Sequence, residues 1–244
     1  MTIETSGRGR LFVIIPALNE AETIADVVAN CRRELCDTVV VINDGSNDDT
    51  ASMARSAGAD VIDHPFNLGV GAAVRTGLTY AVTHGATEVL VVDADGQHDG
   101  AQARALLVAL RTAEADIVVG SRFASGYTVG LSRRFVMRRL SAVVSKRLGT
   151  TINDTTSGFR AFGPRALAVL PKRYPTEYLS DTVETLLIAG QLGLRVCEVD
   201  IEMNTRQGGK PSQSSVGSVY HLARMFTVVL SHAFTTAGKK SHNV

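Results

Sequence analysis

Short apolar runs alternate with segments of helical periodicity along the first half of the chain. Residues 11–15 form one such run, and apolar residues then recur at helical spacing over 24–35, behind Asn19 and Glu22, which are spaced as a helix-capping pair. The runs are apolar at successive positions, so both faces of each strand are expected to be buried. This alternation predicts an α/β fold with a mostly parallel central sheet flanked by helices. The further predicted strands are 38–44, 60–64, 88–92 and 116–122, and the further predicted helices are 48–59, 69–85 and 101–113.

The pattern changes after Arg122, where polar and basic segments separate shorter elements. A basic helix with apolar residues among its arginines is predicted over 133–149, and a short strand over 156–162. The later predicted elements are a helix over 181–193, a strand over 195–203, a polar loop over 204–215 and a last helix over 216–236. We predict a flexible leader over 1–10, one domain over 11–214, and a C-terminal helix and tail over 215–244.

Composition narrows the class of protein. The chain has 244 residues, of which 45% are hydrophobic, so it is long enough and apolar enough to bury a substantial core. A net charge of +1 argues against a general affinity for nucleic acid. The three cysteines form no CxxC pair and predict free thiols in a reducing cytosol. We find no apolar signal region and no run near the ~20 residues that span a bilayer, so we expect a soluble or peripheral protein.

Polar side chains follow three of the predicted strands at the point where each strand ends. In an open parallel sheet, ligands bind at the carboxyl ends of the strands. If these three ends lie side by side, they gather Glu20, Asp44, Asp93, Asp95 and Gln97 around one crevice. Such oxygen ligands suit Mg²⁺ or Mn²⁺, which take one or two carboxylates and complete their shells with substrate phosphate and water. Asp, Asn and Gly are also ordinary turn residues, so a single strand end of this composition would carry little weight.

Six short motifs follow one another along the chain: PALNEAETI, NDGSNDDT, NLGVGAAVRTG, DADGQHD, GSR and TSGFRAF. Their order resembles that of family-two glycosyltransferases with the GT-A fold, and most of all the dolichyl- or polyprenyl-phosphate sugar transferases. The resemblance covers 11–213, and DADGQHD together with SGFRAF is its most specific part. It implies a Rossmann-like GT-A sheet with a C-terminal acceptor-side region. It also implies transfer of a sugar, with inversion, from a GDP- or UDP-linked donor.

The resemblance assigns roles to individual residues. It implies a nucleotide site made by Pro16, Ala17, Asn19, Glu20, Asp44 and Asp93, and a site for Mg²⁺ or Mn²⁺ made by Asp93, Asp95 and Gln97. Asp95 is the expected direct ligand, whereas Asp93 is open to either the ribose or the metal. Arg122 matches the arginine of the GSR motif, which is expected near the phosphates. Asn43 and the loop RQGGKPSQ depart from the commoner family pattern, so the nucleotide base and the role of Lys210 stay open.

The reaction that the resemblance implies builds negative charge on the leaving diphosphate. A metal on Asp95 would act as a Lewis acid, and Arg122, Arg206 or Lys210 would add charge-assisted hydrogen bonds. A polyprenyl phosphate has a second pKa near ~6, so at neutral pH it is largely dianionic and attacks without a general base. The expected acceptor-phosphate residues are Arg122, Arg134, Arg138 and Arg206, and the expected catalytic residues are Asp95, Arg122 and Asp181.

The basic helix over 133–149 offers a surface for an anionic membrane. Arg134 and Arg138 lie one helical turn apart, with apolar residues among the arginines. The same pattern is also typical of a solvated helix that packs on the core. We expect a peripheral protein at the cytoplasmic, inner face of a membrane, with a small membrane partner protein or a homo-oligomer as further partners and no nucleic acid.

Two other functions remain open. A hydroxyl acceptor on a glycan or small metabolite would need a general base, for which Asp154, Asp181 and Glu184 are the candidates. Each of these acids could equally be a helix cap. A non-enzymatic nucleotide-sugar-binding scaffold is the other alternative. The intact Asp93, Asp95 and Arg122 argue against it, since a binding protein needs no ion on a leaving group.

Overall fold

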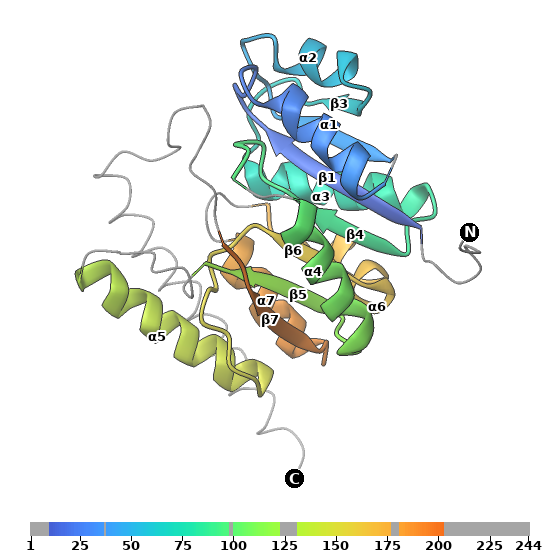
Figure 1. The fold of residues 1–244 in the computed structure, drawn as a ribbon. Helices are drawn as coiled ribbons and strands as arrows, with labels where there is room; N and C mark the ends of the chain where they lie inside the picture. The colour runs from blue at the N-terminus through green and yellow to red at the C-terminus, as the bar shows by residue number, and fades with distance from the viewer. Residues whose placement is uncertain (1–9, 37, 98–99, 123–130, 177–180, 203–244) are drawn as a thin grey trace.

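The computed structural model describes residues 10–36, 38–97, 100–122, 131–176 and 181–202, with the side chains of 131–136 excepted. These residues form a seven-stranded sheet with helices on both faces (Figure 1). Its strand order is β3-β2-β1-β4-β6-β5-β7, and among the described strands only β6 runs antiparallel to its neighbours, β4 and β5. The strands are β1 Leu11–Ala17, β2 Val39–Asn43, β3 Asp60–Asp63, β4 Glu88–Val91, β5 Ile117–Ser121, β6 Arg160–Phe162 and β7 Val196–Asp200. The predicted α/β class with a mostly parallel sheet is confirmed.

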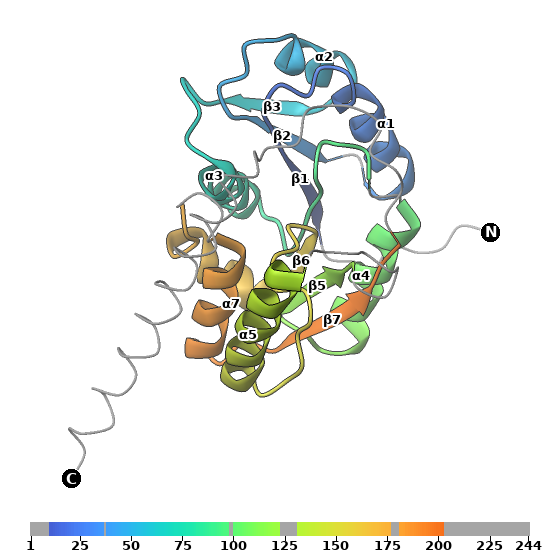
Figure 2. The ribbon, with the colours of Figure 1, turned by 90° about the vertical axis from the view of Figure 1, so that its left-hand side faces the viewer.

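Alternation along the central strand β1 divides the core into two layers. Phe12 and Ile14 belong to the layer that holds side chains of α3, α5 and α7, whereas Val13 and Ile15 belong to the layer with α1, α2 and α4. Successive side chains of a strand point to opposite faces, and both faces are apolar here, so helices cover both (Figure 2). The helices are α1 Ile24–Glu34, α2 Thr50–Ser56, α3 Val70–Thr83, α4 Gly100–Thr112, α5 Leu131–Leu148, α6 Pro164–Leu167 and α7 Asp181–Gln191, with a 3₁₀ turn at Leu170–Lys172.

The first helix begins later than its predicted capping pair. Thr23 precedes the first helical residue, Ile24, and makes no side-chain cap. Asn19 instead has a φ of 55°, and its side-chain oxygen accepts a hydrogen bond of 2.9 Å from the N–H of Asn47. The prediction that Asn19 and Glu22 cap this helix was therefore wrong, because Asn19 joins the turn after β1 to the turn after β2.

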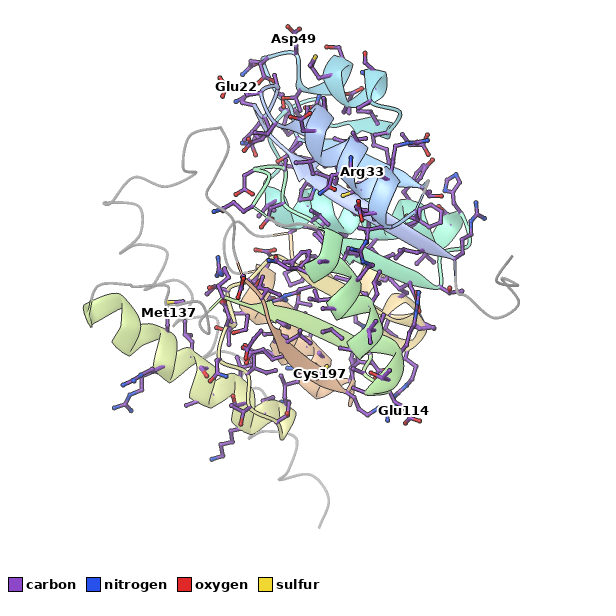
Figure 3. All side chains as sticks on the ribbon, viewed as in Figure 1. Glu22, Arg33, Asp49, Glu114, Met137 and Cys197 are labelled. Atoms are coloured by element: carbon purple, nitrogen blue, oxygen red, sulfur yellow. The ribbon has the colours of Figure 1, made fainter. Side chains whose placement is uncertain are left out.

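Helix α5 uses its apolar residues to pack on α7 and the sheet. Met137, Leu140 and Val144 are buried, and Met137 lies on the side of α5 that faces the sheet (Figure 3). Arg138 and Arg139 are exposed. The described part of this helix thus packs on the core through one stripe and presents its cations to solvent.

Membrane-spanning helices were not expected, and no described helix is both long and apolar enough to cross a bilayer. The predicted C-terminal helix over 216–236 and the loop RQGGKPSQ lie outside the described residues. The predicted leader lies outside them too, except for Arg10.

Candidate active site

Hydrogen bonds between loops join the carboxyl ends of β1, β2 and β4 into one rim. The N–H of Glu20 donates to Thr50 Oγ1 at the start of α2 (2.9 Å). On the other side, Thr23 Oγ1 donates to the carbonyl of Ala94, in the turn after β4 (2.7 Å). Because β1 lies between β2 and β4, the three ends that the sequence singled out do lie side by side. Residues along this rim include all those with a predicted nucleotide role: Pro16, Ala17, Asn19, Glu20, Asp44 and Asp93.

The carboxylate of Asp44 is buried beneath the loop that follows β3. Its Oδ1 accepts the N–H of Leu68 (3.0 Å) and lies 2.7 Å from Nδ1 of His64, while its Oδ2 accepts the N–H of Gly69 (2.8 Å). Nε2 of His64 lies 2.9 Å from Thr76 Oγ1 on α3. The Asp44 side chain is only 5% exposed. Asp44 therefore holds the loop after β3 and the start of α3 in place through these hydrogen bonds. Its direct contact with a nucleotide stays a prediction.

Strand β4 leads into the acidic turn 93–97. The N–H of Gln97 donates to Asp95 Oδ1 (3.1 Å), and Gly96 has a φ of 74°, so the turn closes on the Asp95 carboxylate. Asp93 faces the segment before β6, where a Cβ added to Gly158 would lie 3.2 Å from Asp93 Oδ1. Both aspartates are half-buried. The turn thus presents two carboxylates at the β4 end of the rim.

The donor set of this turn fits a cation that is shared with a substrate. Asp93, Asp95 and Gln97 provide two carboxylates and an amide. Among the residues that the structure describes, no group of three or more His, Cys, Asp or Glu side chains could hold a metal ion. Mg²⁺ and Mn²⁺ bind through one or two carboxylates and take their other ligands from phosphate and water. The residues therefore fit an ion that arrives with a diphosphate, and they do not form a cage made of protein alone.

Arg122 follows β5 and forms a two-pronged ion pair with Asp154. Nε lies 2.7 Å from Oδ2 and Nη2 lies 3.1 Å from Oδ1, while Nη2 also donates to Thr156 Oγ1 (3.0 Å). Burial opposes ionisation of Asp154, but the hydrogen bonds and charge of Arg122, with hydrogen bonds from Thr156, outweigh it and lower the pKa. A fully buried, ion-paired carboxylate is a poor proton acceptor, so the structure argues against Asp154 as a general base. Its oxygen accepts the N–H of Thr156 in a turn (3.1 Å), which is not a helix cap.

Asp181 is the first residue of α7 and is buried beside the acidic turn. Burial raises its pKa to about 6; the positive charge of Arg160 and the N–H groups of Thr182 and of Asp181 itself oppose the rise, and the charge of Asp93 adds to it. Gly71 on α3 packs against it so closely that a Cβ there would come within 2.9 Å of Asp181 Cβ. Asp181 thus receives N–H groups of its own helix terminus, as a cap does, and also lies within electrostatic reach of the predicted metal site. Its role as a base stays a prediction.

Arg160 is the residue of this region that the sequence interpretation missed. It is 1% exposed and is among the largest fully buried side chains of the described chain. Its Nε donates to the carbonyl of Ser157 (2.9 Å), Nη1 to that of Thr182 (2.8 Å) and Nη2 to that of Thr155 (3.2 Å). An arginine inside the apolar run of TSGFRAF was the available signal, because a charged side chain in a buried strand must find partners.

The structure describes the side chains of only some of the residues that were predicted to bind the acceptor phosphate. Arg122 lies at the rim, whereas Arg138 is exposed on α5. Arg206 and Lys210 lie outside the described residues, and so does the side chain of Arg134. Glu184, the third predicted base, lies half-buried in the first turn of α7. Of the two members of this set whose side chains are described, Arg122 follows β5 at the rim and Arg138 lies on α5.

Comparison with protein families gives one family match: residues 12–170 match the model described as glycosyl transferase family 2. A glycosyltransferase of Mycobacterium bovis is 32% identical over 228 residues, which cover 89% of this chain and 96% of the relative. An undecaprenyl-phosphate mannosyltransferase of Micrococcus luteus is 29% identical over 220 residues, covering 84% of this chain and 88% of the relative. A UDP-N-acetylglucosamine–dolichyl-phosphate N-acetylglucosaminyltransferase of Methanococcus voltae is 29% identical over 212 residues, covering 79% and 84%.

Solved structures share the fold. A glucosyl-3-phosphoglycerate synthase from Mycobacterium tuberculosis, in complex with Mn²⁺, UDP and glucosyl-3-phosphoglycerate, superimposes with a TM-score of 0.73. The alignment covers 92% of this chain and 80% of that chain at 23% sequence identity. At that sequence identity the similarity supports the shared arrangement of the sheet and its helices, and it is not evidence for any detail of the site.

Proposed function

Because the chain belongs to glycosyl transferase family 2 and is a nucleotide-sugar-dependent glycosyltransferase, we propose that it transfers a sugar from a GDP- or UDP-linked donor to a polyprenyl phosphate, with inversion. The observation that carries the proposal is the acidic turn of β4, which lies between the predicted nucleotide rim and Arg122. Two relatives support the acceptor class, since their names specify undecaprenyl phosphate and dolichyl phosphate.

We assign the divalent cation, Mg²⁺ or Mn²⁺, to Asp93, Asp95 and Gln97. When bound, such an ion supplies positive charge that stabilises a leaving diphosphate. Asp95 serves as the direct ligand, with one oxygen already oriented by the N–H of Gln97 (3.1 Å). Asp93 is held against Gly158 and serves either the ion or the ribose.

Arg122 is proposed to bind the acceptor phosphate. Asp154 orients the guanidinium, and the Arg122 side chain remains 23% exposed, so a phosphate group can approach it. A phosphate dianion attacks the anomeric carbon through its own oxygen and needs no general base. The engagement of Asp154 in an ion pair is therefore compatible with this acceptor.

A hydroxyl acceptor is the second candidate, and the position of Asp181 is the observation that favours it. With a pKa of about 6, this carboxylate is ionised at neutral pH and lies within electrostatic reach of Asp93, so it is suited to accept a proton. Asp181→Asn separates the two candidates. It should abolish transfer to a hydroxyl and leave transfer to a phosphate largely intact.

Transfer of labelled sugar into an organic phase tests the leading candidate. GDP- and UDP-sugars are incubated with polyprenyl phosphate and Mn²⁺, and the organic phase is counted. Asp95→Ala should abolish transfer, whereas Asp60→Ala, which removes an exposed carboxylate at the opposite edge of the sheet, should not. Wild-type protein that moves label from no donor would contradict the proposal.

We further propose a peripheral position at the cytoplasmic face of a membrane, through α5. Its exposed side carries Arg138, Arg139 and Lys146, each worth roughly 1 kcal/mol near an anionic surface. Arg138→Glu combined with Lys146→Glu should weaken co-sedimentation with anionic liposomes. Arg33→Glu is the matched control, because Arg33 is 67% exposed on α1, which covers the other face of the sheet. Undiminished sedimentation of the double variant would leave α5 with a packing role only.

A further inference from the structure

A positive charge is buried where an apolar side chain of similar length would fill the space. Arg160 lies on β6, between Val91 of β4 and Val119 of β5, on the face that α7 covers. Burying an ion is costly, and apolar replacements of buried charges are often neutral or stabilising. Burial lowers the pKa of this guanidinium, against the favourable negative charges of Asp181 and Asp154. A side chain that only filled this space would not need to be a cation.

The partners of Arg160 lie on two segments that meet at the rim. Two of its three hydrogen bonds end on the carbonyls of Thr155 and Ser157, which precede β6. The third ends on the carbonyl of Thr182 in the first turn of α7, next to Asp181. The planar guanidinium fork sets the direction of all three hydrogen bonds at once, which a single ammonium group cannot do.

Segment 154–158 in turn contacts two predicted site residues, which follow the strands on either side of β6. Asp154 and Thr156 hold the guanidinium of Arg122. Gly158 lies so close to Asp93 that even a methyl group would press on its carboxylate. The segment is therefore the common support of the predicted metal ligand that follows β4 and the predicted phosphate ligand that follows β5.

We propose that Arg160 is a positioning residue, which holds segment 154–158 so that Asp93 and Arg122 keep the spacing required between a metal-bound diphosphate and the acceptor phosphate. The inference rests on the proposed function, because it concerns the same cation site. It adds a residue that touches neither ion nor substrate. It also adds a reason for the charge of Arg160, which offsets the negative charges of the buried Asp154 and Asp181.

Two glycines that flank β6 give a matched test. Gly158→Ala adds a methyl group 3.2 Å from Asp93 Oδ1, whereas Gly163→Ala, at the other end of the strand, meets no atom nearer than 3.5 Å. The probe is Mn²⁺, titrated by its electron paramagnetic resonance signal in the presence of saturating UDP or GDP, whichever raises the wild-type melting temperature more. Residues that orient metal ligands typically contribute a factor of roughly 10–100 to metal affinity, and Gly158→Ala should lose a factor of this size. Gly163→Ala should lose none.

A second pair of variants tests Arg160 itself. Arg160→Lys keeps the charge but loses the fork, and Arg111→Lys makes the same change in the pair with Glu88, at the opposite end of β4. Mn²⁺ affinity should fall by about tenfold in the first and stay unchanged in the second. If Gly158→Ala and Arg160→Lys both retain wild-type Mn²⁺ affinity, the positioning role is wrong while the proposed function stands. If wild-type protein binds no Mn²⁺ with either nucleotide, the proposed metal site fails, and this inference fails with it.

Discussion

Replacement of Asp181 by asparagine should stabilise the protein at neutral pH. The carboxylate is buried at the start of α7, and burial raises its pKa from 3.8 to about 6 in the folded chain. Above that pH the folded protein holds a buried negative charge that the unfolded chain holds in water. The neutral amide removes this cost, and its carbonyl oxygen can still accept the N–H of Thr182.

The magnitude follows from the two pKa values. A rise of about 2 units corresponds to roughly 3 kcal/mol of unfolding free energy, which the wild-type protein lacks above pH 6. The sign follows from proton binding, because between the two pKa values the folded state holds the proton and the unfolded state does not. Stability therefore decreases as pH rises through this window. In a chain of this length, roughly 3 kcal/mol corresponds to a melting temperature ~6–12 °C higher for the variant.

Thermal unfolding of both proteins in EDTA measures the difference. Metal must be absent, since a cation near Asp93 would add positive charge beside Asp181. The gain from Asp181→Asn should be roughly 3 kcal/mol at about pH 7.5 and roughly half of that at about pH 5. Asp200→Asn, at an exposed position on β7, should change neither value. A gain of the same size at both pH values, or a less stable variant, would refute a desolvation penalty at this position.

Further substitutions examine the supports of the rim. Arg122→Met leaves the carboxylate of Asp154 buried without its partner and should lower the unfolding free energy in urea by about 3–5 kcal/mol. Most of that loss should return when Asp154→Asn is added, and a loss below about 1 kcal/mol would show that the pair contributes little. Gly45→Ala places a Cβ 2.5 Å from the carbonyl carbon of Phe66 at a φ of 74°, and should cost more than the roughly 1–3 kcal/mol of backbone strain alone. Gly149→Ala, at a φ of 71° with nothing within 4 Å, shows the strain alone, and equal losses in urea would mean that contact with Phe66 does not matter.

The strands were predictable because their signal is local. Runs such as 89–92 are apolar at every position, and a continuous apolar run of this length is enough to predict a strand that is buried on both faces. The direction of β6 was not predictable in the same way. It is set by the connection through α5, which returns the chain to the edge where β5 ends, and the three residues of β6 carry no sign of it.

The residues of the rim could be predicted from the sequence, but their hydrogen-bond partners could not. Sequence order placed Asp44 and Asp93 at strand ends, and parallel strands bring such ends together. The partners of Asp44 come from a loop more than twenty residues away, so its burial under Leu68 and Gly69 could not be derived from neighbouring residues. The prediction for Asn19 was wrong for the same reason. Its position matches a local capping pattern, but its side-chain oxygen accepts a hydrogen bond from the N–H of Asn47, which is distant in sequence.

The reversed strand β6 has a consequence for altering the enzyme by design. Its register is fixed twice, because Arg160 is paired with Val91 on one side and with Val119 on the other. A one-residue slip would turn Arg160 to the opposite face of the sheet and carry Ala161 into its place. Insertions and deletions are therefore best confined to residues 149–151, which are exposed after the end of α5, because Ile152 is fully buried and its N–H and carbonyl bond to serines of α5. Changes of loop length there should leave the central sheet in register.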